Sequence, residues 1–113
     1  MAYDEGLAQR IREQVTDQPG ITEKKMFGGL SFLLNGNMAC GVIKDELIIR
    51  VGPNSDALHQ PHTRPFDFTG RPMNGWVVVA PAGFDSDQSL HHWLEQGIHF
   101  ARSLPAKEWN YQP

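Results

Sequence analysis

Two glycines in the segment EKKMFGGLSFLL, Gly28 and Gly29, follow a pair of lysines and have the composition of a phosphate-binding loop. Such a loop places its glycines between a strand and the N-terminus of a helix, where free backbone N–H groups point at the anion. Here the glycines lead into Leu30–Leu34, a strand-like run, and no Lys-Ser or Lys-Thr pair follows them. The pair therefore predicts a tight turn or a β-bulge, and we expect no bound cofactor.

Cys40 is the only cysteine and the natural candidate for a catalytic nucleophile. A reactive thiol needs an activating base or a positive microenvironment. Cys40 lies in a strand-like run between Ala39 and Gly41, without a histidine in the flanking residues, so we expect a buried structural side chain. A histidine that approaches from elsewhere in the fold is the alternative that the sequence leaves open.

The five histidines raise the question of a metal site. His92 and His99 share one face of a predicted helix, with Glu95 near it, and His59 and His62 form a second pair in a loop. Neither pair has the spacing of a His-Glu-x-x-His motif or a zinc finger, and zinc sites need three or four converging ligands. We therefore expect no metal site, and no Ser-His-Asp constellation can be identified from spacing.

The remaining candidates belong to a surface that binds a partner. Alternation in the strand-like runs sends Leu33 and Ile48 to the face opposite their apolar neighbours, so both faces of the sheet carry apolar residues. This favours a hypothesis in which a second copy or another protein covers one face. Basic side chains nearby extend the hypothesis to an acidic or phosphate-bearing partner. The candidate interaction surface consists of Lys24, Lys25, Leu33, Ile48, Arg50 and Arg71.

Hydrophobic periodicity predicts the elements that position these residues. Tyr3 to Val15 predicts an amphipathic helix that Pro19 and Gly20 stop, and residues 85–104 predict a second, with Asp85 as candidate N-cap. Between them, strands are expected at 21–27, on both sides of the Asn35–Gly36 turn, at 47–51 and at 76–81, with a short helix at 53–58. The predicted turn residues are Gly28, Gly29, Asn35, Gly36 and Gly70.

This order predicts an α+β fold, in which an antiparallel meander sheet packs against an N-terminal and a C-terminal helix as a two-layer sandwich. At 113 residues the chain has the length of one domain, which we place at residues 1–105, followed by a tail at 106–113.

The formal net charge of −3 disfavours direct DNA binding, because a protein that binds DNA on its own normally carries a basic surface. A single cysteine, no membrane span and no secretory signal predict a cytoplasmic protein.

Several segments, in this order, resemble the N-terminal domain of the TfoX/Sxy family: TEKKMFGGLSFLLNGNMACGV, RVG, RPFDFTGRPMNGWVVV and FARSLP. The resemblance covers nearly the whole chain and implies a small α+β fold with an antiparallel sheet. It also implies a link to transcription, because full-length members of this bacterial family promote competence gene expression together with the cyclic-AMP receptor protein. Those regulators usually add a C-terminal helical domain, which we do not find before Pro113. The resemblance implies no catalytic residues.

Three hypotheses follow for function. The leading one is a non-enzymatic interaction module that acts through protein contacts, with a homodimer as one form of contact. The second is a small enzyme with a site between sheet and helices, built on Cys40 or the histidines. The third is an accessory contact to nucleic acid through Lys24, Lys25 and Arg71.

Overall fold

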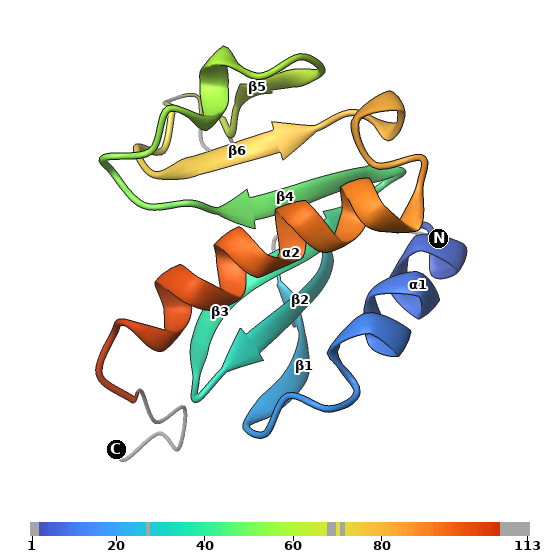
Figure 1. Ribbon diagram of the computed structural model, residues 1–113, viewed down its shortest axis with the longest axis vertical. Coiled ribbons are helices and arrows are strands. Elements are labelled where there is room, and N and C mark those ends of the chain that lie inside the picture. Colours follow the sequence, from blue (N-terminus) through green and yellow to red (C-terminus); the bar gives the residue numbers. More distant parts are fainter. Residues whose placement is uncertain (1–2, 27, 68–69, 71, 107–113) are drawn as a thin grey trace.

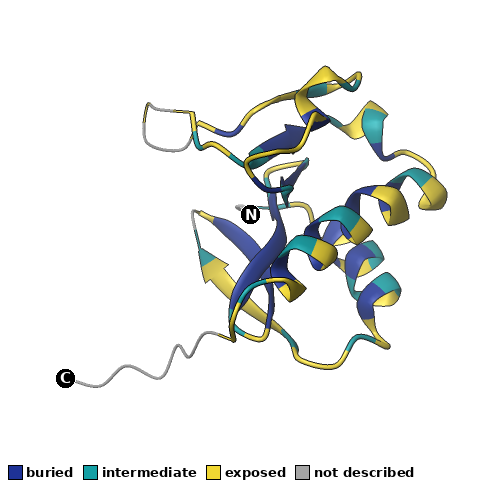
Figure 2. Ribbon diagram, turned by 60° about the vertical axis from the view of Figure 1, so that its left-hand side comes forward, coloured by how far each residue is buried: buried dark blue, intermediate teal, exposed yellow. Residues whose placement is uncertain are grey.

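Two α-helices cover one face of a six-stranded antiparallel sheet (Figures 1 and 2). The structure is a computed structural model, which describes residues 3–26, 28–67, 70 and 72–106. In this part of the chain the helices are α1 (Glu5–Val15) and α2 (Asp87–Arg102). The arrangement confirms the predicted α+β class with helices packed on an antiparallel sheet.

The strand order of the sheet is β1-β2-β3-β4-β6-β5. The first four strands form the predicted meander, whereas β6 lies between β4 and β5, so the last two strands are out of chain order (Figure 1). Two short 3-10 helices, η1 and η2, precede β5 and α2 respectively. The bounds are β1 (Ile21–Met26), β2 (Gly29–Leu34), β3 (Asn37–Ile43), β4 (Glu46–Arg50), η1 (Ala57–His59), β5 (Thr63–Pro65), β6 (Trp76–Val79) and η2 (Pro81–Gly83).

Two local predictions are corrected. The short helix expected at 53–58 is the single 3-10 turn η1, because Ser55 and its neighbours favour turns: the Ser55 hydroxyl accepts a hydrogen bond from the backbone N–H of Ala57 at 3.1 Å. The N-cap of α2 is Ser86 rather than Asp85, and its hydroxyl accepts from the N–H of Ser89 at 3.0 Å.

The twin glycines form the turn between β1 and β2, in which Met26 pairs with Gly29. Gly28 has a φ of +77°, a conformation that other residues adopt only with strain. Gly29 is required for a different reason: an added Cβ would lie 2.1 Å from the carbonyl oxygen of Val42 on β3. Both glycines therefore serve the path of the backbone. Phe27, between them and Met26, lies outside the described residues.

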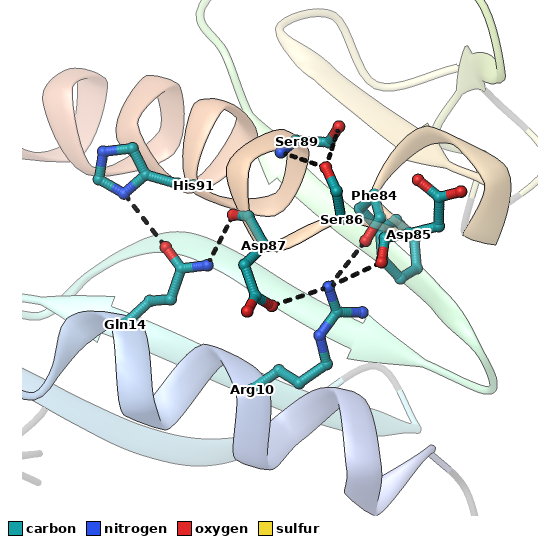
Figure 3. A network of polar contacts seen from close by, with 8 residues as sticks. All are labelled: Arg10, Gln14, Phe84, Asp85, Ser86, Asp87, Ser89 and His91. Atoms are coloured by element: carbon teal, nitrogen blue, oxygen red, sulfur yellow. Dashed lines mark hydrogen bonds and ion pairs between the residues drawn. The ribbon is translucent and has the colours of Figure 1, made fainter.

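A network of polar contacts fastens α1 to the start of α2 (Figure 3). The guanidinium of Arg10 donates to the carbonyl oxygen of Phe84 at 2.9 Å and contacts the carboxylate of Asp87 at 3.4 Å. One turn further along α1, the Gln14 amide donates to the backbone oxygen of Asp87 at 3.0 Å and accepts from Nδ1 of His91 at 3.1 Å. These contacts position both helices on the same face of the sheet.

A β-bulge in β3 lies at a close contact between α2 and the sheet. Phe32 pairs with Cys40 and Leu33 pairs with Met38, so Ala39 has no partner on β2. At this point an added Cβ on Gly97 of α2 would lie 2.3 Å from the carbonyl oxygen of Ala39. The helix therefore contacts the backbone of the strand directly, with glycine at the point of contact.

Candidate functional site

The face of the sheet opposite the helices carries a second hydrophobic cluster of its own. Its buried members are Leu33 on β2, Met38 on β3, Ile48 on β4, Val78 on β6 and Phe66. Phe66 belongs to the segment between β5 and β6, in which the N–H of Met73 donates to the carbonyl oxygen of Phe66 at 2.8 Å. We call this group the second cluster. It is built entirely from one chain.

The second cluster corrects the expectation that Leu33 and Ile48 lie on an exposed apolar surface. Both side chains point to the predicted face, but each is only 2% exposed. Phe66 contributes to this burial from a loop whose position the sequence pattern does not predict. Met73 and Trp76 also pack against the cluster. The apolar reason for expecting a second copy on this face is thereby removed.

The basic members of the candidate surface do not form one patch. Lys24 and Lys25 are both exposed on β1, but neighbouring residues of a strand point to opposite faces. Lys25 shares the helix-covered side with Glu23, which binds Arg12 of α1 at 2.7 Å, whereas Lys24 lies opposite Ser31 on the other side. Arg50 is on β4, three inter-strand spacings or about 14 Å from β1. Arg71 lies outside the described residues.

A shallow groove of about 250 Å³ remains open beside the second cluster. Ile43, Ile48 and Phe66 contribute apolar walls, and a double hydrogen bond between Arg64 and Glu46, 2.6 Å on each branch, lies at the rim. Hydrogen bonding by Arg64 lowers the pKa of the Glu46 carboxyl below its ordinary value. Because the charges of Arg64 and Glu46 already neutralise each other, we expect the pair to stabilise the sheet rather than to bind a partner.

Cys40 is a buried structural residue, as the sequence predicts. Its side chain is 1% exposed in the core beneath the helices, and burial raises the pKa of the thiol from 9.0 to about 12. The thiol is therefore protonated at neutral pH and cannot act as a nucleophile there. The enzyme hypothesis loses its main candidate residue.

We expect Cys40 to react with iodoacetamide at pH 8 at least about 100-fold more slowly in the folded chain than in denaturant. The folded chain also holds the thiol proton more tightly than the unfolded chain does, so this contribution to stability is complete below pH 9 and is lost as the pH rises toward 12. Mass spectrometry of the labelled chain measures the rates. Rapid labelling of a chain that retains its native circular dichroism would contradict the assignment.

A cavity of about 450 Å³ is a surface hollow between η2, α2 and the segment before β5. His62, Ser89 and His92 line it, so it holds the residue types of an acyl-transfer site. Their contacts do not join them: the Ser89 hydroxyl is bonded to Ser86 at 2.8 Å, and Nε2 of His92 contacts the Gln96 amide at 3.2 Å. No nucleophile–base pair is formed here among the described side chains.

The other histidine predictions have a similar outcome. His62 and His92 line the same cavity, but His59 and His99, their predicted partners, are exposed and do not line it. Within residues 3–26, 28–67, 70 and 72–106, no group of three or more His, Cys, Asp or Glu side chains is placed to hold a metal ion. In the same residues, no helix combines the length and the apolar character that crossing a membrane requires.

The family model of the TfoX N-terminal domain matches residues 13–101 of the chain. The chain belongs to this family. The match to the TfoX N-terminal domain begins within α1 and ends within α2, so it covers all six described strands of the sheet. Neither a curated protein nor a solved structure matches the chain. The twin glycines, the second cluster and the segment between β5 and β6 all lie inside the part that matches the TfoX N-terminal domain.

Proposed function

We propose that this domain is a non-enzymatic interaction module that acts through protein contacts in the regulation of transcription. The observation that carries the proposal is the family match over residues 13–101. The resemblance to the TfoX/Sxy family implies the link to the regulation of transcription. The negative formal charge of −3 supports a protein partner over autonomous binding to DNA, which requires a basic footprint.

The contact surface that we propose consists of charged side chains that remain accessible, in two separate regions on β1 and at the end of β4. Thr22 to Lys25 on the edge strand β1 are all exposed, and Arg50 lies at the end of β4. Leu33 and Ile48 are no longer part of this surface, since they support the fold from inside the second cluster. Edge-strand lysines also oppose uncontrolled strand pairing, which keeps β1 available for a specific contact.

The proposal is tested by affinity capture with the immobilised chain under native conditions, with nuclease treatment to remove contacts bridged by nucleic acid. Lys24→Glu and Lys25→Glu form a matched pair, because the two side chains are exposed on the same strand but point to opposite faces. We expect a protein retained by the wild type to be at least about fivefold depleted with one variant and not with the other. Sedimentation of the same chains measures self-association.

A chain that captures no protein and also sediments as a strict monomer at high concentration would contradict the proposal. Capture that disappears after nuclease treatment would assign the surface to nucleic acid instead, in agreement with the accessory-contact hypothesis. Equal capture by the wild type and both lysine variants would leave an interaction module but would move the contact away from β1.

A further inference from the structure

The guanidinium of Arg50 lies close to two aromatic rings contributed by different elements. Its Cζ atom is 5.1 Å from the ring centroid of Trp76 and 5.3 Å from that of Phe100. Trp76 opens β6 directly opposite Arg50 in the sheet, whereas Phe100 comes from the last turns of α2. Both distances are within the roughly 6 Å over which a cation and an aromatic face attract each other. The rings therefore hold the guanidinium at a fixed place.

Arg50 differs from the other described arginines in what its N–H groups contact. Each of the other described arginines contacts an acceptor oxygen on another side chain, in the pairs Arg10–Asp87, Arg12–Glu23, Arg64–Glu46 and Arg102–Gln18. Among the described residues no carboxylate or hydrogen-bond acceptor contacts the Arg50 guanidinium. Partial burial without a compensating anion lowers the pKa of Arg50 below its ordinary value.

The guanidinium also lines a small cavity of about 100 Å³ at this end of the sheet, which we call the Arg50 cavity. Its walls are Arg50, Gly52, Pro53, Asn74, Gly75, Trp76 and Phe100. The volume is well below the roughly 300 Å³ at which pockets begin to enclose drug-sized ligands. The cavity has room for the end of one side chain and not for a nucleotide.

We propose that the Arg50 cavity binds a single carboxylate from an acidic segment of a partner protein. The planar guanidinium offers two parallel N–H donors that match a carboxylate, and its Cζ atom already lies within cation–π distance of both Trp76 and Phe100. Arginine and tryptophan are also the residues that most often dominate binding energy in protein interfaces. The inference rests on the proposed function and gives the chemistry of the partner that this function requires.

The charges around the cavity favour a carboxylate over a phosphodiester chain. Among the described residues that line the cavity, Arg50 is the sole cation. A nucleic-acid strand is held by several cations that neutralise successive phosphates, and its affinity falls steeply with salt. One guanidinium in a small cavity neutralises one negative charge, which is what an Asp or Glu side chain brings.

The test is a titration of the ¹⁵N-labelled chain with N-acetyl-glutamate amide, observed at the Arg50 Nε–H and the Trp76 indole N–H by NMR. We expect saturable shifts at millimolar probe and no saturation with N-acetyl-glutamine amide, which has the same shape without the charge. Arg50→Lys keeps the charge but loses the fork, so its affinity should fall at least about tenfold. The matched control is Arg64→Lys, because Arg64 is already paired with Glu46.

A second variant keeps the test decisive if Arg50→Lys loosens the packing of the two rings. Asn74 is exposed at the wall of the cavity, so Asn74→Asp adds a competing carboxylate and should lower the affinity at least about fivefold. Saturation with the glutamine probe, unchanged affinity in Arg50→Lys and Asn74→Asp, or dimethyl phosphate binding as tightly as the carboxylate would each overturn the proposal.

Failure of this site and failure of the proposed function give different results. A protein captured equally by the wild type and Arg50→Lys would leave the interaction module in place and overturn the Arg50 site. A saturable titration in a chain that captures no protein and sediments as a strict monomer would support the carboxylate site and contradict the proposed function.

Discussion

Leu33→Asp is expected to destabilise the folded chain by about 4 kcal/mol or more. The substitution removes a side chain that is 2% exposed and places a charge without a partner inside the second cluster. For a domain whose total stability is on the order of 5–15 kcal/mol, this corresponds to a fall in Tm of roughly 15 °C or more. Thermal unfolding followed by circular dichroism measures the change.

The matched control is Thr22→Asp, because Thr22 pairs with Leu33 across the β1–β2 ladder but is exposed. A new carboxylate there should lower stability by no more than about 1 kcal/mol. Were Leu33 instead a surface contact between two copies, Leu33→Asp would change the sedimentation of the protein and leave the Tm of the monomer near that of wild type. That outcome would contradict the second cluster as part of the core.

Gly97→Ala is expected to destabilise the chain by roughly 2–3 kcal/mol, although alanine is the better helix former. In an isolated helix the substitution would add about 1 kcal/mol of stability. Here the added Cβ would lie 2.3 Å from the carbonyl oxygen of Ala39, so α2 must move away from β3 and lose packing along its buried face. Urea unfolding, with the midpoint and slope compared between the two chains, measures the loss.

His99→Ala provides the control two residues further along the same helix. The His99 side chain is exposed, so its replacement should change the free energy of unfolding by no more than about 0.5 kcal/mol. If Gly97→Ala were as stable as the wild type, α2 would have to lie further from the β-bulge than the structure places it.

The local elements could be predicted from the sequence because each has a strong periodic or turn signal. The spacing of Leu7, Ile11 and Val15 gives α1, and these side chains are buried as the pattern requires. Asn35 and Gly36, with φ of +51° and +85°, form a two-residue hairpin turn. Alternation likewise assigned Leu33 and Ile48 to the face away from the helices, where both lie.

The candidate site was harder to predict because its contacts join residues that are distant in the sequence. Alternation says which face Leu33 occupies but not that Phe66 packs against the same cluster. In the same way, nothing local to Arg50 indicates that Trp76 and Phe100 bracket its guanidinium. The burial of an apolar face and the environment of a charge both depend on the path of the irregular segments, for which no periodic signal exists.

The place of β6 between β4 and β5 has a consequence for folding during synthesis. While the ribosome has released only the first four strands, neither the β6 residues that complete the sheet nor Phe66, which joins Leu33 in burial, has emerged. Because α2 is translated later still, the nascent meander exposes aggregation-prone apolar side chains on both of its faces. We expect the cooperative collapse of this domain to wait for its C-terminal third, and chaperones that bind nascent chains to meet it before then.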